Sequence, residues 1–437
     1  MFTLAAKDGR IHWLEFPPLL PYGLSGSLTL CVSRFSQKGG GPLSWLRDSV
    51  REFFQKGDLL LLGLCVAASG YGLVLIFSAT RYLGDNNRKV LVQAAAILLG
   101  VLVYIFFSAV DIELITEKSW KLLLVFNVVF VLLTLTPLRV EGTNGNQSWI
   151  HIPGFPVNLQ PAEIVKLTFV LLLAWQFHKL QERGLSKPFS VFQTAGHTLF
   201  MCGIVAVASG DFGMVLTYLF IFVTVAWAGG IKKRWFLLAL VAAVAAVVLI
   251  WPHVSGDYRM RRFTVVIDHL IGNPDTLQEQ TLGTGYQQSR SILYIGSGGL
   301  FGQGFLKGVQ TQSYNSMPKY VRETDEIFAV CGEEFGLVGC ALLLLLLSCI
   351  ILRCVWVARK ARSPQSALIA MGYAGMLLIQ IAVNVGMCLY IFPVVGLTLP
   401  FISYGGSSIV TMFAAMGIVS SIKMRSLPSW LRDRSKL

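Results

Sequence analysis

Residues Ile327 to Leu352 read IFAVCGEEFGLVGCALLLLLLSCIIL. Apart from Glu333 and Glu334, the stretch has no charge, and it exceeds the roughly 20 helical residues that cross the hydrocarbon core of a bilayer. A helix pairs its own backbone groups, so it is the default structure for a segment surrounded by lipid. The stretch therefore predicts a transmembrane helix, and the rest of the chain must be compatible with a membrane fold.

The composition of the whole chain agrees with a membrane protein. The 437 residues are 54% hydrophobic and 14% charged, and their mean hydropathy is +0.64, which is too apolar for a soluble globular chain. We predict an all-α polytopic membrane protein with about ten transmembrane helices. The predicted spans are Leu59 to Thr80, Val90 to Val110, Trp120 to Pro137, Pro161 to His178, Phe192 to Ser209, Phe212 to Gly230, Trp235 to Trp251, Ile327 to Leu352, Ala367 to Pro393 and Pro400 to Ile422.

The distribution of Lys and Arg predicts the orientation in the membrane. Many of these residues lie in segments that ten crossings place on the same side as the N-terminus: Arg34, Lys38, Arg47, Arg51, Lys56, Lys232, Lys233, Arg234, Arg353, Arg359, Lys360, Arg362, Lys423, Arg425, Arg432, Arg434 and Lys436. By the positive-inside rule this side is cytoplasmic. Both termini are then cytoplasmic, and the long segment 253–325 between spans seven and eight is a large extracytoplasmic loop.

Three parts follow from this topology. Residues 1–57 form a cytoplasmic N-terminal extension, in which residues 42–54 fit an interfacial helix. Residues 58–424 form the transmembrane domain, and residues 425–437 form a basic cytoplasmic tail.

The sequence disfavours two interpretations: binding of nucleic acid, and stabilisation by disulfides or zinc. The net charge of +13 would suit nucleic acid, but topology signals and contact with anionic membrane lipids account for it, so we expect no nucleic-acid partner. The eight Cys lie mostly within spans and lack CxxC or Cys/His spacing, so we expect neither disulfides nor a zinc site.

The large loop carries cations on the side where few are expected: Arg259, Arg261, Arg262, Arg290, Lys307, Lys319 and Arg322. This excess indicates an anionic, lipid-linked substrate at the outer surface. The loop also contains the glycine-rich run Ile295 to Gly304. Closely spaced glycines let a backbone approach a ligand and donate N–H groups to phosphate oxygens, but a flexible re-entrant turn explains the same spacing.

A few ionisable residues could carry chemistry. Asp325 lies at the mouth of span eight, where burial raises and nearby Arg322 lowers a carboxyl pKa, so it could act as a base near neutral pH, or simply as a cap or ion-pair member. Glu163 and Lys166 share a face of span four, as a structural ion pair or a substrate contact. Asp211 reads more simply as a cap of span six.

The chain resembles the SEDS family of bacterial RodA/FtsW proteins from about Asp58 to Met424. The matching stretches are Asn144–Gly145 through Trp149–Ile150, Gln160–Pro161–Ala162–Glu163 with Lys166, Tyr258 to Phe263, Gln288–Ser289, Ile295 to Gly304, Gln310 and Gln312, Thr324 to Ala329, Glu333 to Gly336, Asn384 to Met387, Pro393 to Gly396, and Leu399 to Ser408. The last of these is the most specific.

The resemblance implies a peptidoglycan glycosyltransferase that polymerises lipid II, the undecaprenyl-pyrophosphate-linked disaccharide peptide, for elongation, division or sporulation. Asp325 matches the residue held to be catalytic, and Glu163 with Lys166 matches a charge pair in the central cavity. The resemblance requires no cofactor, although a divalent cation, Mg or Mn, could assist, and it implies a class B penicillin-binding protein as partner. The residues expected to bind substrate are Arg261, Arg262, Lys307, Gln310, Gln312, Ser403 and Ser407.

The chain departs from the family beside the proposed base. Where the family usually reads His-Thr-Asp-Phe, this chain reads Glu323-Thr324-Asp325-Glu326, which predicts that like charges raise the pKa of Asp325. Two other functions remain open: a lipid II flippase, because transporters also place charges at depth, and a non-catalytic scaffold for a penicillin-binding protein.

Overall fold

The computed structural model describes residue 51 and residues 53–81, 86–140, 148–151, 158–254, 258–313 and 321–426. Each predicted span lies largely on a helix of this part: α3 (Leu59–Thr80), α4 (Asn86–Ala109), α5 (Ile112–Leu132), α6 (Pro161–Gln181), α7 (Pro188–Ser209), α8 (Phe212–Ala228), α9 (Lys233–Val254), α14 (Ile327–Arg359), α15 (Pro364–Cys388) and α16 (Gly406–Met424). Seven helices of the described part are long and apolar enough to cross a membrane, and α8 is a shorter apolar helix. The predicted all-α polytopic fold is confirmed.

Among the predicted starts of the spans, two lie furthest from the helix starts of the structure. α5 begins at Ile112 rather than Trp120, because Asp111 caps it by accepting a hydrogen bond from the Leu114 N–H at 3.2 Å, and its charged first turns hide this start from a hydropathy pattern. α16 begins at Gly406 rather than Pro400. The preceding turn has a positive φ of 65° at Phe401, and the Leu399 N–H donates to Ser403 Oγ at 2.8 Å.

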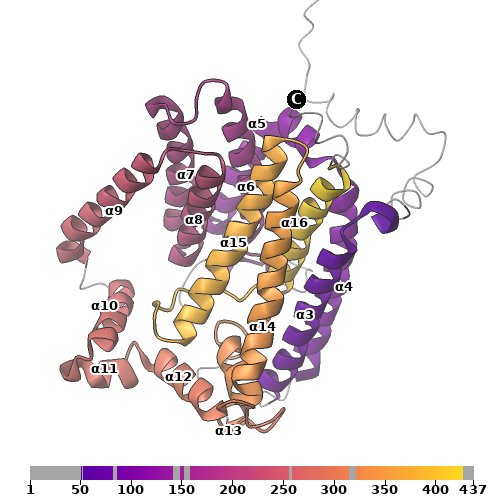
Figure 1. Cartoon of the computed structure of the whole chain (residues 1–437). Helices are drawn as coiled ribbons and strands as arrows, with labels where there is room; N and C mark the ends of the chain where they lie inside the picture. Colours follow the sequence, from indigo (N-terminus) through magenta and orange to yellow (C-terminus); the bar gives the residue numbers. More distant parts are fainter. Residues whose placement is uncertain are drawn as a thin grey trace, which may run out of the picture. The chain divides into compact units, whose positions relative to one another are not determined.

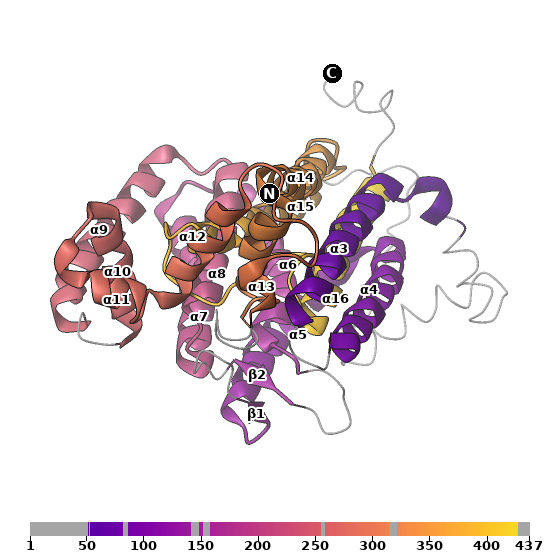
Figure 2. The ribbon, with the colours of Figure 1, turned by 90° about the horizontal axis from the view of Figure 1, so that it is seen from below.

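The helices pack so that α6, α15 and α16 are largely enclosed by others. α16 packs along α4, α14 lies between α3 and α15, and α15 also contacts α6 and α8 (Figures 1 and 2). Along α4, by contrast, Leu91, Leu98 and Leu102 are more than 60% exposed and share a face at helical spacing. That face is suited to lipid.

The large loop is mostly helical and contributes to one end of the bundle. It contains α10 (Tyr258–Ile271), the 3₁₀ turn η2 (Pro274–Thr276), α11 (Leu277–Thr281), α12 (Tyr286–Gly298) and the short α13 (Val309–Gln312). α12 packs on α14, and α13 touches both α14 and α3 (Figures 1 and 2). Elsewhere, β1 (Arg139–Val140) pairs antiparallel with β2 (Trp149–Ile150), and a 3₁₀ turn η1 (Leu133–Leu135) follows α5.

α14 is broken at Gly336, and the glycine-rich run of the loop fills the break. Gly336 has φ 64° and ψ −162°, a conformation that essentially only glycine adopts. The N–H groups of Leu337 and Val338 donate to the carbonyls of Gly299 and Leu300, at 2.9 and 3.1 Å. In return, the N–H groups of Gln303 and Gly304 donate to the carbonyls of Glu333 and Glu334, at 2.9 and 3.0 Å.

The glycines of this run are therefore explained by contact between backbones. A Cβ at Gly298 would clash with the Gly332 carbonyl, and one at Gly302 would clash with the Glu334 carbonyl. The exchange of hydrogen bonds satisfies groups that the break would otherwise leave unpaired within a membrane protein. Of the two sequence interpretations, these contacts favour the re-entrant turn over the phosphate cradle, and the turn is held by hydrogen bonds rather than flexible.

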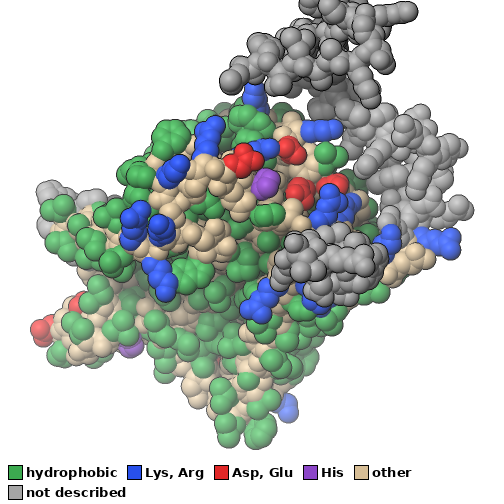
Figure 3. Space-filling model, turned by 45° about the horizontal axis from the view of Figure 1, so that its top comes forward, with side chains coloured by type: hydrophobic (Ala, Val, Ile, Leu, Met, Phe, Trp, Pro, Cys, Tyr) green, Lys and Arg blue, Asp and Glu red, His purple; other side chains and the backbone are tan. Residues whose placement is uncertain are grey.

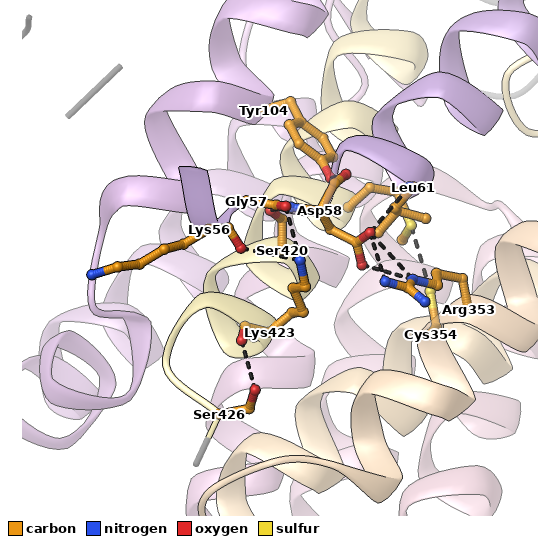
Figure 4. A network of polar contacts seen from close by, with 11 residues as sticks. Lys56, Gly57, Asp58, Leu61, Tyr104, Arg353, Cys354, Ser420, Lys423 and Ser426 are labelled. Carbon is orange, nitrogen blue, oxygen red and sulfur yellow. Dashed lines mark hydrogen bonds and ion pairs between the residues drawn. The ribbon is translucent and has the colours of Figure 1, made fainter. Parts of the chain in front are cut away.

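The opposite end of the bundle is joined by a second polar network (Figure 4). Asp58 caps α3, and its carboxylate accepts three hydrogen bonds from Arg353 of α14, at 2.9 to 3.2 Å. Its N–H donates to Ser420 Oγ of α16 at 3.1 Å, and its carbonyl accepts from the Tyr104 hydroxyl of α4 at 2.8 Å. Four helices are tied together there.

The predicted orientation in the membrane, with the positively charged side cytoplasmic, stays a prediction. The face shown in Figure 3 displays Lys and Arg side chains, with Asp, Glu and His side chains among them. Residues 42–50 of the predicted interfacial helix lie outside the described part, whereas Phe53 is buried edge-on to Tyr104, with ring centroids 5.9 Å apart.

Candidate active site

Asp325 lies in the turn that leads into α14, and the backbone of this turn is held by α15 and by the segment that joins α15 to α16. Asn384 Nδ2 donates to the Asp325 carbonyl at 2.9 Å and to the Leu397 carbonyl at 2.8 Å. Ser403 Oγ donates to the Thr324 carbonyl at 2.6 Å, and the Tyr404 N–H donates to the Glu323 carbonyl at 2.7 Å. Asp325 is 6% exposed. The turn is thus fixed residue by residue, as a catalytic group requires.

The two carboxylates that flank Asp325 each have their own partners. Glu323 forms an ion pair with Lys89 of α4, and the Lys89 ammonium also lies 5.7 Å from the centre of the Tyr404 ring. Glu326 accepts hydrogen bonds from Gln287 Nε2 at 2.9 Å and from Ser291 Oγ, both on α12.

These partners bear on the predicted like-charge repulsion. Lys89 offsets the charge of Glu323. Burial raises the pKa of Glu326, although hydrogen bonds from Ser291 and Gln287 oppose that rise, so its neutral form is favoured relative to a solvated carboxyl. The predicted rise in the pKa of Asp325 stays a prediction.

Two further carboxylates of α14 hold the short helix α13. Glu333 accepts from the N–H groups of Gln310 and Thr311, at 2.8 and 2.7 Å, and from the Thr311 hydroxyl at 2.5 Å. Glu334 accepts from Ser78 Oγ at 2.6 Å and from Gln312 Nε2 at 3.2 Å. The predicted substrate residues Gln310 and Gln312 are therefore tied into the framework around the turn.

The predicted cations occupy different places. Arg262 Nη1 donates to the Val394 carbonyl at 2.9 Å, which fastens α10 to the segment after α15. Arg261 and Lys307 are exposed. Hydrogen bonds from Thr284 lower the pKa of Glu279, and the charge of Arg261 adds to that effect. Arg261 and Lys307 thus keep solvent access for an anionic group, whereas Arg262 has a structural contact.

The predicted cavity charge pair is present and buried. Lys166 Nζ lies 2.7 Å from Glu163 Oε2, and Ser408 Oγ donates to the same oxygen at 3.3 Å. Ser407 Oγ is buried without a hydrogen-bond partner among the described residues. Because Ser403 contacts Thr324 and Ser408 contacts Glu163, one short segment links the charge pair to the turn that carries Asp325.

Asp211 lies near this pair and caps α8, as predicted. It accepts from the Met214 N–H at 3.0 Å and from Gln160 Nε2 at 2.9 Å. Burial raises the pKa of Asp211 to about 6, against the lowering effect of the Met214 hydrogen bond. In the described ranges, no three His, Cys, Asp or Glu side chains converge as a metal site would need, and the divalent cation stays a prediction.

The sequence alone did not indicate several residues of this site. Ser78 and Lys89 come from α3 and α4, far from Asp325 along the chain, and no motif marked them. Asn384 stood within a matching stretch, but nothing in the pattern showed that its amide would hold the carbonyl of Asp325.

Comparison with known families agrees with this geometry. Residues 58–427 match the model of the FtsW/RodA/SpoVE family, which is described as cell cycle protein. The chain belongs to this family. The match covers all the FtsW/RodA/SpoVE positions discussed above, from the α3 cap to α16, and confirms the predicted family.

Individual members of the FtsW/RodA/SpoVE family align over nearly their whole lengths. Stage V sporulation protein E of Bacillus subtilis is 29% identical over 374 residues, which are 84% of this chain and 97% of that protein. Peptidoglycan glycosyltransferase MrdB of Escherichia coli is 31% identical over 367 residues, 83% of this chain and 91% of that protein. A chain solved in work on structural coordination of polymerization and crosslinking by a peptidoglycan synthase complex shares 26% identity, with a TM-score of 0.68 over 87% of this chain and 99% of that chain.

Proposed function

We propose that this member of the FtsW/RodA/SpoVE family polymerises lipid II into glycan strands at the outer face of the bacterial cytoplasmic membrane, with Asp325 as the base. Its relatives support a glycosyltransferase role in cell-wall synthesis. The observation that supports the residue assignment is the buried turn at Asp325. Asn384 and Ser403 hold this turn by donating hydrogen bonds to the carbonyls of Asp325 and Thr324.

The reaction forms one bond and breaks one. The Asp325 carboxylate accepts the proton of the acceptor sugar's 4-hydroxyl, and that oxygen attacks the anomeric carbon of the donor. The bond from this carbon to undecaprenyl pyrophosphate breaks, and the electron pair leaves with the pyrophosphate. A positioned base contributes about 10²–10⁴-fold to such a step.

The leaving group gains negative charge, which nearby cations stabilise. Arg261 and Lys307, which are exposed on the loop, are the candidates for this contact, and a Mg or Mn ion could share it. Glu163, Lys166 and Ser407 line the buried polar region next to the turn and are candidates for holding the remainder of the substrate.

The topology and partner are also part of the proposal. Contacts such as Lys89–Glu323 and Gln160–Asp211 join segments that ten crossings place outside, whereas Asp58–Arg353 joins segments placed inside. This supports N- and C-termini on the same side of the membrane, and the positive-inside rule makes that side cytoplasmic. The structural relative belongs to a complex that polymerises and crosslinks, which supports a class B penicillin-binding protein as partner.

The test is polymerisation of purified lipid II in liposomes, with the partner present in a form inactive in glycosyl transfer. Asp325→Asn keeps the size of the side chain but removes the base, so turnover should fall at least about 100-fold. Asp275→Asn, at an exposed position of the same loop, is the matched control and should leave turnover unchanged. Equal activity of wild type and Asp325→Asn would remove Asp325 from the mechanism.

The same liposomes address the alternative functions. If neither protein polymerises lipid II with its partner, transfer of labelled lipid II between leaflets separates a flippase from a scaffold. A flippase would move lipid II without forming chains, and a scaffold would do neither.

A further inference from the structure

Glu326 is a buried carboxylate that the glycosyl transfer step does not use. It is 0% exposed, and its two oxygens accept hydrogen bonds from Gln287 Nε2, at 2.9 Å, and from Ser291 Oγ. Gln287 and Ser291 are four residues apart on α12, so both donors come from one face of that helix. Through these hydrogen bonds Glu326, the residue that precedes α14, holds the first half of α12.

The other contacts of α12 show why this link matters. At its end, α12 meets α14 backbone to backbone, since Gly298 lies against the Gly332 carbonyl. Gln288 Nε2 donates to the Phe392 carbonyl at 2.7 Å, and the Tyr294 hydroxyl donates to the Gln310 carbonyl at 3.0 Å. α12 therefore connects α13, the segment after α15 and the start of α14.

The turn is held on both sides of the Asp325 side chain. On one side the Asp325 carbonyl is held by Asn384 of α15, and on the other the next residue, Glu326, is held by α12. We propose that Glu326 is a positioning residue for glycosyl transfer, whose carboxylate fastens α12 to the turn and so fixes the loop helices around the base. The proposal rests on the proposed function, because it gives Glu326 its role through Asp325.

The polar nature of this link is a property of this chain. The family pattern quoted above usually has Phe at this position, which cannot accept the two hydrogen bonds. In this chain Gln287 and Ser291 supply the two donors, and Ser291 is fully buried. Without its acceptor, the buried Ser291 hydroxyl would be left unsatisfied, which is costly, and the half-buried Gln287 amide would lose its partner. The first half of α12 should then loosen.

The kinetic test uses the full-length chain with its partner in liposomes. Glu326→Leu keeps the volume but removes both acceptors, so kcat should fall about tenfold while the KM for lipid II stays within about twofold. Glu326→Gln should stay within about twofold of wild type, because its amide can still pair with both α12 side chains. The double variant Ser291→Ala, Glu326→Leu should have nearly the same kcat as Glu326→Leu alone, since both substitutions remove the same hydrogen bond.

Hydrogen–deuterium exchange of the same proteins measures α12 directly. Exchange of residues 286–292 should be faster in Glu326→Leu and Ser291→Ala, and unchanged in Glu326→Gln. Ser297→Ala is the matched control, because Ser297 lies on α12 but donates to the Tyr294 carbonyl instead of Glu326, and neither kcat nor exchange should change.

The outcomes separate this inference from the function on which it rests. If Asp325→Asn stays active while Glu326→Leu still loosens α12, the assignment of the base fails and the link survives. The positioning role is overturned if Glu326→Leu keeps wild-type kcat, if Glu326→Gln loses as much as Glu326→Leu, or if kcat falls without any change in exchange of residues 286–292.

Discussion

The two ends of the helix bundle bury carboxylates in different ways. Asp58 meets a guanidinium, Arg353, through three hydrogen bonds, and the guanidinium also lies 3.9 Å from the centre of the Trp356 ring. At the other end, Glu323 also has a cationic partner, Lys89, but the contacts of Glu326 and Glu334 come from hydroxyl and amide groups. Neutral donors hold a carboxyl group in place without cancelling its charge.

This difference distinguishes a carboxylate that joins helices from the carboxyl groups near the proposed base. A carboxylate paired with Arg has its charge and its geometry determined by the fold, and is suited to joining helices. Carboxyl groups held by neutral donors remain ionisable, and they surround the turn that carries the proposed base. The strongest tests of this comparison ask whether a substitution at one end changes stability without changing turnover, and the reverse.

Removing the carboxylate of Asp58 should have the largest effect on folding. Asp58→Ala leaves Arg353 without its partner in a site where Asp58 is 1% exposed, and breaking such a pair costs about 3 kcal/mol or more of unfolding free energy. Thermal unfolding in detergent measures the loss. The kcat of the protein that remains folded should stay within about twofold of wild type.

The control for this variant is Lys179→Ala, which removes an exposed ion pair with Glu117 at the same end. Its unfolding temperature should not change measurably, because solvent screens such pairs. A tenfold loss of kcat in Asp58→Ala at unchanged stability would show that the two ends are not separable.

Gly336→Ala should be the next most harmful change. Alanine is strained at φ 64°, ψ −162°, and its Cβ would clash with the backbone of Gly302, so we expect a loss of about 1–3 kcal/mol with reduced turnover, measured by thermal unfolding and lipid II polymerisation. Gly296→Ala is the matched control, since a Cβ on α12 there meets open space and alanine favours helix. If both variants behaved alike, the break in α14 would have no special role.

Lys89→Gln should shift the pH dependence of turnover without abolishing it. Without Lys89, the charge of Glu323 is no longer offset beside Asp325, and a nearby negative charge favours the protonated acid. The acid limb of the kcat/KM profile should therefore move to higher pH, by about half a unit to one unit. Lys89→Gln combined with Glu323→Gln should restore it, and a shift that persists in the double variant would contradict the charge argument.

Asp211→Asn should have the smallest effect, and one that depends on pH. The pKa of Asp211 is raised from 3.8 to about 6, so the folded chain binds more protons than the unfolded chain between these values, and its stability falls as the pH rises through them. A neutral asparagine avoids this loss. Relative to wild type, the variant should gain about 1–3 kcal/mol as the pH rises from 4 to 7. The acceptor oxygen that it replaces should cost the same amount at every pH, so the net effect near pH 7 is small.

Thermal unfolding at several pH values from 4 to 8 measures the difference for Asp211→Asn. Asp275→Asn, at an exposed carboxyl, should show no pH-dependent gain. A constant offset at every pH would mean that the ionisation of Asp211 does not contribute to stability.

The sequence predicted the features that depend on local pattern. Hydropathy located the spans, because roughly 20 apolar residues are needed whatever the neighbouring helices are. The Glu163–Lys166 pair and the cap at Asp211 were predicted because polar groups next to or within spans are costly without a partner. The catalytic role of Asp325 came from the family resemblance and stays a prediction. These inferences need no knowledge of how the helices pack.

What the sequence did not predict depends on contacts between distant segments. The ion pair of Lys89 with Glu323 joins α4 to the turn before α14, and no periodicity records such a contact. The break at Gly336 lies inside a continuous apolar run, so the pattern favoured an unbroken helix. The same limit applies to Leu399–Gly405, where hydrogen bonds to the Asp325 turn replace the start of a helix.

The glycine-rich run also bears on how the protein can change during evolution or be engineered. Surface loops usually accept insertions, because extra residues add little closure entropy. Residues 299–304, however, form part of the hydrogen bonding of α14 on both sides of Gly336, so one added residue would misalign every bond in that exchange. The segment whose composition most resembles a linker is thus among those least free to vary in length, and a tag or fluorescent domain belongs elsewhere in the loop.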